Sequence, residues 1–288
     1  MKRILGYALY TIAVFILFLY VLFPSEQVVD YAEARFERMV PTADLTLEEI
    51  RPVAPFSVRA VGPRVRWRDM EVFAGDDVVV DPAVLATLRK KPAAAVTARA
   101  YGGTLKADIS MSAPGLRDPL SAHLEIRDVD VSAMSALQKA AGRKVMGAVS
   151  GKVDFTGIVN QWHRGEGGGR LEVGGGGIEL VEGLVDLEYL TFDSLIAEFD
   201  MKNGVVNLSR CEMSGRQVNG ELSGDIRLSP SLPQSSLNLT GTINPTNEFF
   251  MEIGTDSPVA QLLREKAQRG RVPVRISGTL ARPLMNFR

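Results

Sequence analysis

Cysteine and histidine are almost absent from this chain of 288 residues. The one cysteine, Cys211 in the run LSRCEMSG, excludes an intramolecular disulfide, and we expect it to pack as a small apolar residue on a strand. The two histidines, His123 and His163, lie in different segments with no cysteine or carboxylate at ligand spacing. The sequence therefore predicts neither a metal site nor a cofactor.

An excess of charge of either sign is also lacking. The chain has 33 Lys and Arg residues against 34 Asp and Glu residues, which gives a formal net charge of -1. Such a balance creates no global basic field to attract nucleic acid or anionic lipid. We therefore expect no nucleic-acid partner, and any electrostatic partner has to meet a local patch.

The motifs of common enzyme classes are missing as well. The chain contains no G-x-S-x-G elbow, no H-E-x-x-H motif and no Cys-His pairing. Acidic neighbours such as Glu48 with Glu49 point to opposite faces of a strand and are predicted to be solvated. The glycine tract GEGGGRLEVGGGG, residues 165–177, lacks the Lys-Ser/Thr pair and the following helix of a phosphate loop, so we expect a flexible connection between strands. The sequence predicts a protein that is not an enzyme.

One long uncharged run lies near the start. Residues 4–23, ILGYALYTIAVFILFLYVLF, cover roughly 30 Å at the helical rise of about 1.5 Å per residue, enough to cross a bilayer core. The run ends at Leu22-Phe23-Pro24 and not at the small residues of a cleavage site, which favours an uncleaved transmembrane helix over a signal peptide. The predicted membrane anchor includes Ile4, Leu9, Val14, Leu19 and Phe23.

The flanking charges predict the orientation of this helix. Lys2 and Arg3 precede it, whereas Glu26 and Asp30 follow it, so residues 1–3 are expected to form a cytoplasmic tip. Residues 24–40 then show apolar positions at helical spacing, with Ser25 as the predicted N-cap. We expect an amphipathic stalk helix that lies on the membrane or on the folded domain, with binding of a partner as the alternative.

Beyond residue 41 the apolar residues mostly recur with a period of two. The stretch VNGELSGDIRLSP, residues 218–230, alternates almost perfectly, and similar stretches are YGGTLKADISMS, VMGAVSGKVDFTG, SSLNLTGTINP and VPVRISGTLARP. Clean alternation is typical of antiparallel strands with one face in water and one face buried. Glycines on the apolar face favour bends and close approach of chains. The fold class predicted for residues 41–288 is mainly β, with a curved antiparallel sheet, as an open groove or a sandwich, and a few short helices.

Turn and helix signals complete this organisation. Asn203-Gly204 is a type I′ hairpin signal, and the SGRQ run at 214–217 predicts the next reversal. Helical patterns start at Asp81, Asp130 and Thr255, and cover residues 81–91, 130–144 and 255–270. Three short helices cannot cover the apolar face of a dozen or so strands.

The apolar face must therefore be covered by another sheet, by curling of the sheet, or by something from outside, because soluble surfaces rarely expose large apolar patches. The candidate lining residues of an apolar groove are Leu105, Ile109, Val149, Val153, Phe155, Leu222, Ile226, Leu228, Val274 and Ile276. A second candidate surface is the cluster RVRWRD, where Arg64, Arg66 and Arg68 share one strand face. We interpret it as a polar outer face, with a headgroup or partner contact as the alternative.

Several blocks of the sequence resemble one known family. They are the anchor, FSVRAVGPRVRWRDMEVF, AVTARAYGGTLKADISMS, DVDVSAMSALQKAAGRKVMGAVSGKVDFTG and NGVVNLSRCEMSGRQVNGELSGDIRLSP. Together they are similar to the type II secretion system protein N (GspN) family and, more distantly, to AsmA-like envelope proteins. The likeness covers nearly the whole chain, through patterns of glycine and alternating apolar residues.

The resemblance implies a single-pass protein of the bacterial inner membrane with a periplasmic β-domain. Its expected partners are the inner membrane and other components of the type II secretion system, in support of export of folded proteins across the outer membrane. The AsmA likeness implies an alternative, a module that binds or transfers phospholipid acyl chains in an apolar groove. The family supplies no catalytic residues.

Overall fold

The computed structural model describes residues 22–40, 42–53, 56–67, 70–83, 92–113, 118–180, 187–252 and 271–287, and eight single positions, namely Tyr7, Tyr10, Val14, Phe18, Tyr20, Gln261, Arg264 and Glu265. Within them the chain is mainly β, as the alternating pattern predicts. The dominant element is one 14-stranded sheet in which all neighbouring strands are antiparallel.

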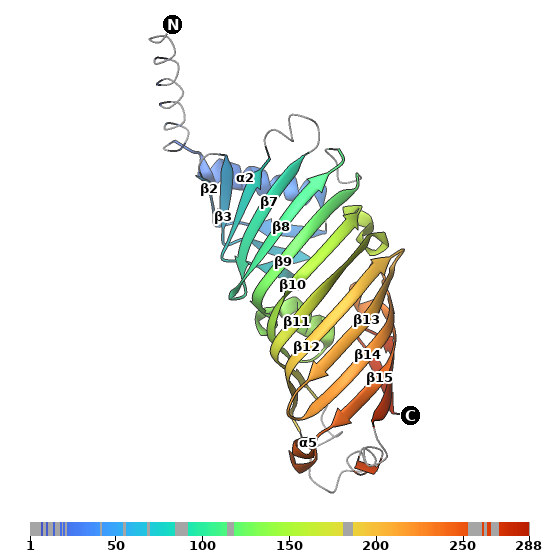
Figure 1. The fold of residues 1–288 in the computed structure, drawn as a ribbon. Helices are drawn as coiled ribbons and strands as arrows, with labels where there is room; N and C mark the ends of the chain where they lie inside the picture. Colours follow the sequence, from blue (N-terminus) through green and yellow to red (C-terminus); the bar gives the residue numbers. More distant parts are fainter. Residues whose placement is uncertain are drawn as a thin grey trace.

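The strands of this sheet follow one another almost in sequence order (Figure 1). From one end to the other they are β2 (Glu49–Val53), β3 (Ser57–Val61), β6 (Asp77–Pro82), β7 (Ala93–Ala100), β8 (Gly103–Met111), β9 (Leu120–Asp130), β10 (Val145–Gly157), β11 (Glu166–Glu179), β12 (Tyr189–Lys202), β13 (Val205–Ser214), β14 (Val218–Arg227), β15 (Ser236–Pro245), β16 (Val272–Thr279) and β17 (Pro283–Phe287). The sheet is not closed, because β2 and β17 stand at its two ends.

A smaller sheet and short helices accompany the large one. The small sheet has the order β1 (Ala43–Thr46), β4 (Arg64–Trp67) and β5 (Met70–Ala74). The helices are α2 (Ser25–Met39), α4 (Ser135–Ala141) and α5 (Asn247–Glu252), with 3-10 turns η1 (Val131–Ala133), η2 (Val159–Arg164) and η3 (Leu232–Gln234). The helices remain few, as predicted, and the described residues form no second large sheet that would make a sandwich.

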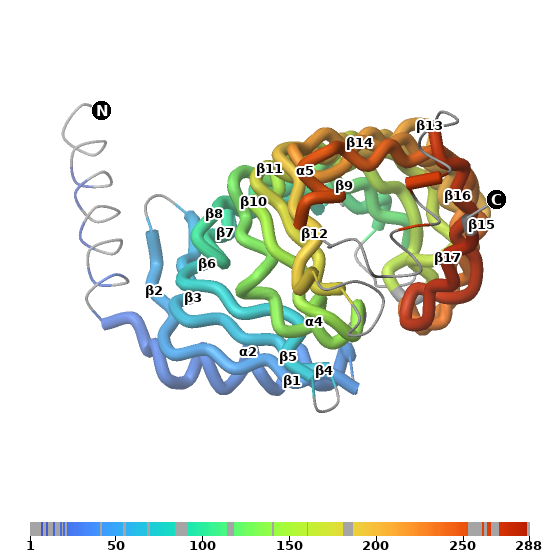
Figure 2. Tube along the Cα trace, turned by 90° about the horizontal axis from the view of Figure 1, so that it is seen from below, coloured from blue at the N-terminus to red at the C-terminus, as the bar shows by residue number. Residues whose placement is uncertain are grey.

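The large sheet curls along its length (Figure 2). Its C-terminal strands β15 to β17 turn toward the side on which α4 and the small sheet lie. In β10 the residues Lys152, Asp154 and Thr156 are exposed, whereas Val149, Val153 and Phe155 are half-buried. The inner side of a curled sheet loses more contact with water than the outer side, so the apolar positions face inward. We call these two sides the concave and the convex face.

Helix α2 lies on the folded domain, one of the two placements predicted for the stalk. It packs against β1 and β2. The prediction that Ser25 is its N-cap is wrong, because Pro24 holds that position and Ser25 is the first helical residue. The Ser25 hydroxyl donates a hydrogen bond to the Ile50 carbonyl (2.8 Å) and accepts one from the Ile50 N–H (3.3 Å). A contact between residues 25 positions apart competes with local capping and cannot be seen in a local pattern.

The glycine tract at 165–177 is not a flexible connection, and that prediction is wrong. Residues 166–179 form β11, which pairs with β10 and β12 over nearly its full length. A Cβ atom on Gly167 would lie 2.1 Å from the Asp154 carbonyl oxygen, and one on Gly169 would lie 2.5 Å from that of Lys152. The missing side chains allow close approach of the neighbouring strand, so the glycines serve the sheet itself.

The other local predictions have mixed outcomes. The hairpin at Asn203-Gly204 is confirmed, with φ values of 51° and 80° between β12 and β13.

The helical pattern from Asp130 is confirmed by η1 and α4, and the Asp130 carboxylate accepts a hydrogen bond from Ser132 N–H (2.8 Å). The helix predicted from Asp81 is wrong at its start, because Asp81 and Pro82 continue β6, where they pair with Ala95 and Ala94. Residues 84–91 lie outside the described part, as does most of the helix predicted at 255–270.

The predicted anchor falls mainly outside the described residues. Ile4, Leu9 and Leu19 lie outside the described residues, while Val14 is helical and Phe23 lies just before α2. In the described part of the chain, no helix combines the length and the apolar character needed to cross a membrane. The transmembrane helix stays a prediction from the sequence.

The close approach at Gly167 leads to a test of β11. We expect Gly167→Ala to lower the free energy of unfolding by about 2 kcal/mol, because the new methyl group would overlap the Asp154 carbonyl. Urea denaturation of the full chain in detergent micelles, followed by circular dichroism, measures the change. The control is Gly174→Ala in the same strand, where a Cβ atom would meet nothing within 4 Å. Equal stability of the two variants would contradict this account of the glycines.

Candidate functional site

The register of the large sheet brings the predicted lining residues to one face. Val153 pairs with Leu124 on one side and with Gly169 on the other, and Phe155 pairs with Ala122 and Gly167. The same face continues in both directions through the pairs Leu105–Ile126, Ile109–Ala122, Val149–Val173, Leu222–Cys211, Ile226–Leu237, Val274–Gly241 and Ile276–Leu239. Leu228 directly follows β14, and its N–H donates to the Gly204 carbonyl (2.8 Å).

The N-terminal end of this face is covered. Ile50, Ala98, Ala100 and Val129 are buried near the small sheet. Tyr101 joins the two sheets, because its ring makes an edge contact with Phe73 of β5 (6.2 Å between centroids) and its hydroxyl accepts a hydrogen bond from the Ala74 N–H (2.8 Å). Burial raises the pKa of the Tyr101 hydroxyl. These contacts form a first hydrophobic core.

The C-terminal end is covered in a different way. Val218, Leu239, Val272 and Val274 are buried where the sheet curls, and Phe249 of α5 is buried there as well. The buried side chain of Gln217 holds this end together, since its amide oxygen accepts a hydrogen bond from the Thr191 N–H (2.7 Å) and its amide nitrogen donates to Glu252. This is a second hydrophobic core.

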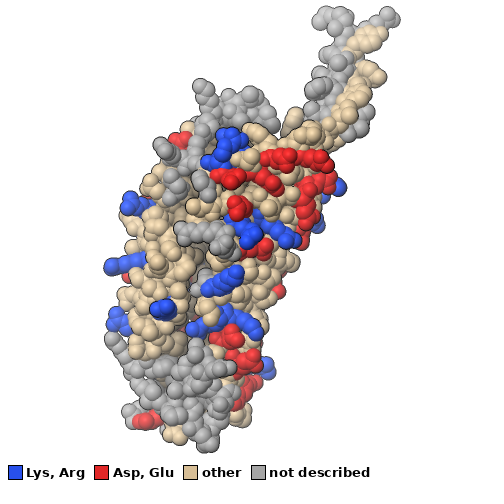
Figure 3. Space-filling view, turned by 180° about the vertical axis from the view of Figure 1, so that it is seen from behind, with Lys and Arg blue, Asp and Glu red and all other residues tan. Residues whose placement is uncertain are grey.

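Between the two cores the apolar face is only half-buried. We call this region, from β8 to β14, the apolar strip, and it consists of Leu105, Ile109, Leu124, Val149, Val153, Phe155, Leu171, Phe199, Leu208, Cys211, Leu222 and Ile226. Six strand spacings of about 4.8 Å make it about 29 Å long. Seen from the concave side, acidic and basic side chains form a band along one side of the molecule, further Lys and Arg side chains stand along the opposite margin, and surface without charged side chains lies between them (Figure 3). A half-buried apolar surface of this length is the most unusual feature of the molecule.

The convex face carries charges in ion pairs. Arg170 on β11 pairs with Glu198 on the neighbouring strand β12, whereas Arg210 pairs with Glu212 of the same strand, β13 (2.6 Å). The hydrogen bond from Arg210 lowers the pKa of Glu212. His123 contacts Asp154 through its Nδ1 atom (2.7 Å), which explains this histidine as a surface partner of a carboxylate on the next strand. Exposed pairs of this kind contribute little to stability and keep the outer face in water.

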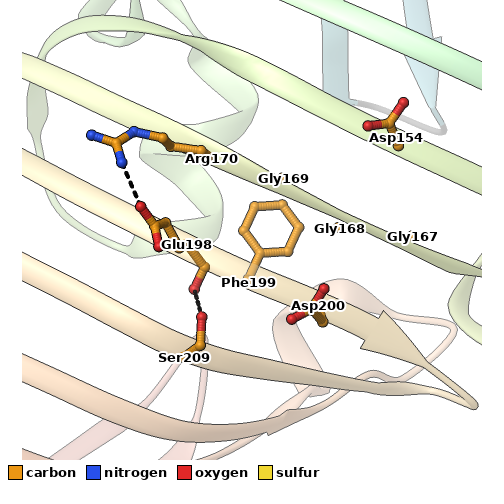
Figure 4. Close-up of a pocket in the computed structure, with 9 residues that line it drawn as sticks. All are labelled: Asp154, Gly167, Gly168, Gly169, Arg170, Glu198, Phe199, Asp200 and Ser209. Carbon is orange, nitrogen blue, oxygen red and sulfur yellow. Dashed lines mark hydrogen bonds and ion pairs between the residues drawn. The ribbon is translucent and has the colours of Figure 1, made fainter.

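An open depression of about 510 Å³ lies over the glycine tract (Figure 4). Asp154, Arg170, Glu198, Asp200 and Ser209 line it, together with three glycines and Phe199. Three of its four charged side chains are in ion pairs, since Arg170 pairs with Glu198 and Asp154 with His123. Among the residues that the structure describes, no group of three or more His, Cys, Asp or Glu side chains is arranged to hold a metal ion. The depression therefore gives no indication of a metal site or of a cluster of reactive groups among its described residues.

The basic cluster gives a polar strand face. Arg64 and Arg66 are exposed on β4, and the register places Arg66 between Asp44 of β1 and Glu71 of β5. Arg68 lies outside the described residues. Carboxylates on both neighbouring strands balance this cluster, which supports its interpretation as a solvated outer face.

No family model, no curated protein and no solved structure matches the chain. The apolar strip is accordingly interpreted from its own geometry.

Cys211 offers a direct probe of the strip. Burial raises the pKa of its thiol, so less thiolate is present at neutral pH. We expect its alkylation by iodoacetamide at pH 8 to be at least tenfold slower than that of a cysteine placed on the convex face by Ser223→Cys in a Cys211→Ser background. Equal rates would show that the strip is as open to water as the convex face.

Proposed function

We propose that this chain binds lipid acyl chains on the apolar strip, as a protein of the bacterial cell envelope. The observation that carries the proposal is the half-buried apolar face of an unclosed sheet, bounded at each end by a hydrophobic core. The strip bears only apolar side chains and a thiol, so it suits a ligand without polar groups along its length.

The dimensions and energetics of the strip fit hydrocarbon chains. Its length of about 29 Å is close to the roughly 30 Å of a bilayer core, which accommodates two acyl chains end to end. Each methylene group that leaves water on such a surface gains up to about 0.8 kcal/mol. A lipid chain is thus a favourable cover for a face that the described helices leave open.

The proposed location of the β-domain in the cell envelope rests on the predicted membrane anchor. The helix expected at residues 4–23 would place the N-terminus in the cytoplasm and the β-domain in the periplasm. Helix α2, directly after this segment, packs on β1 and β2. In this proposal the N-terminal end of the sheet lies next to the inner membrane, where lipids are available.

A role in type II secretion is the second candidate. It is supported by the resemblance of the quoted blocks to the GspN family, and those blocks lie on neighbouring strands. FSVRAVGPRVRWRDMEVF covers β3, β4 and most of β5, AVTARAYGGTLKADISMS covers most of β7 and all of β8, and the C-terminal block covers β13 and β14. In this candidate the domain acts through other components of the secretion machine.

Deletion of the gene separates the two candidates. If the chain serves secretion, we expect export of folded enzymes to fall while the permeability of the outer membrane stays unchanged. If lipid binding is its task, we expect outer-membrane permeability to rise while export continues. Secreted enzyme activity and uptake of a hydrophobic dye measure these two outcomes.

A charge on the strip tests acyl-chain binding directly. We expect the full chain, purified in detergent without added lipid, to retain lipid that native mass spectrometry detects. Val153→Glu should reduce the bound lipid at least fivefold, because a carboxylate at the centre of the strip resists removal from water. Lys152→Glu, its neighbour on the convex face, is the matched control and should leave the bound lipid unchanged. A wild-type chain free of lipid would refute the proposal.

A further inference from the structure

The two edge strands of the large sheet, β2 and β17, differ in whether other residues bond to their outer backbone groups. At the β2 end, the helix α2 residue Ser25 bonds both backbone groups of Ile50 in β2, and the Glu33 carboxylate accepts a hydrogen bond from the Leu47 N–H in the connection just before β2 (2.8 Å). Such coverage blunts an edge that would otherwise pair with another chain. At the other end, no described residue bonds to the outer side of β17.

The alternation of hydrogen-bonded and non-bonded residue pairs between β16 and β17 shows which backbone groups of β17 point away from the sheet. Thr279 and Arg282 exchange backbone hydrogen bonds in both directions, 3.3 and 3.1 Å. Because bonded and non-bonded pairs alternate along antiparallel strands, Leu284 and Asn286 bond to β16. Met285 and Phe287 then direct their backbone groups away from the sheet. The free edge thus offers the N–H and C=O of Met285 and the N–H of Phe287.

The side chains of this edge are exposed as well. Leu284 is 62% exposed on the convex side, and Met285 is 56% exposed on the concave side, where it follows Ile276 in register. An added strand would therefore continue the apolar concave face with its own apolar residues. Its alternate residues would lie on the convex side beside Leu284 and Asn286.

The charges near β17 indicate which residues an added strand would place on the convex side. Arg275 pairs with Asn286 in register, and Arg282 directly precedes β17. Arg275 donates to the Asn238 side chain (3.0 Å), and neither arginine forms an ion pair with a carboxylate among the described residues. Two unbalanced cations on the convex side favour carboxylates on an incoming strand.

We propose that β17 is a docking edge for an extended segment of another protein, in which apolar residues alternate with acidic ones. The segment adds a fifteenth strand, with its apolar residues beside Met285 and its carboxylates near Arg275 and Arg282. A second copy of β17 fits less well, because Pro283 has no N–H to offer at one of the paired positions and the copy would add further arginines. This inference is independent of lipid binding on the strip.

The position of β17 suits such docking. Thirteen strand spacings of about 4.8 Å separate it from β2, roughly 62 Å along the sheet. Helix α2 and the C-terminal strands lie at opposite ends of the large sheet (Figure 1). The edge is thus far from the segment that is predicted to enter the membrane, and a partner can reach it without displacing α2.

Substitution at Met285 tests the proposal with the full chain in detergent micelles. The probe is a fluorescent peptide of three Val-Glu repeats, and its anisotropy gives the Kd. Met285→Pro removes the outward N–H without breaking a bond to β16, so we expect the Kd to rise at least tenfold. Met285→Thr keeps the N–H and should change the Kd less than threefold. Hydrogen exchange of the β17 amides should slow when the wild-type chain binds the peptide.

Two further measurements do not depend on how Met285→Pro folds. A peptide N-methylated on alternate residues cannot complete the ladder, and a Val-Lys peptide has the wrong charge; each should bind the wild-type chain at least tenfold more weakly. Equal binding of all three peptides, or no binding of the Val-Glu peptide, refutes the proposal. Light scattering tests whether a second copy of this chain occupies the β17 edge. A wild-type dimer that Met285→Pro converts to a monomer would identify a second copy as the occupant and overturn the proposal of another protein.

Discussion

Backbone hydrogen bonding between neighbouring strands is the constraint on which the rest of this structure depends. In an antiparallel ladder the register assigns every side chain to one of two faces. Across the large sheet it places Leu124, Val153 and Leu171 on one side and Glu125, Lys152 and Arg170 on the other. A shift by one residue in any strand would exchange these faces. The apolar strip is therefore a property of the ladder as a whole.

Curvature then gives the two faces different surroundings. The described helices reach only parts of the concave side: α4 packs on β5 and β10, and α5 contributes Phe249 at the C-terminal end. Glycine makes tight contact between strands possible where side chains would collide, as at Gly167. The result is a sheet with a hydrophobic core at each end and a half-buried apolar surface between them.

Much of this arrangement could be predicted from the sequence, because alternation of apolar and polar residues is a local signal. It identified the face of Leu105, Val153 and Leu222 correctly. It failed for β11, where glycines replace the apolar side chains that mark a strand and only Leu171 and Val173 keep the period. It also failed at Ser25, whose partner Ile50 is distant in sequence. The curl of the large sheet and the position of the small sheet decide which parts of the apolar face are covered. Neither of them produces a pattern in a short stretch of sequence.

The order of the strands bears on how the molecule is made. From β6 to β17 each strand pairs with the one that follows it in the sequence. Most of these neighbours are joined by short loops, which cost little chain entropy and favour rapid formation, whereas residues 246–271 connect β15 to β16. A chain that emerges from the ribosome with its N-terminus first can add each hairpin to a sheet already present. Assembly then resembles the growth of a repeat array, in which the last strand added is always the one left without a neighbour.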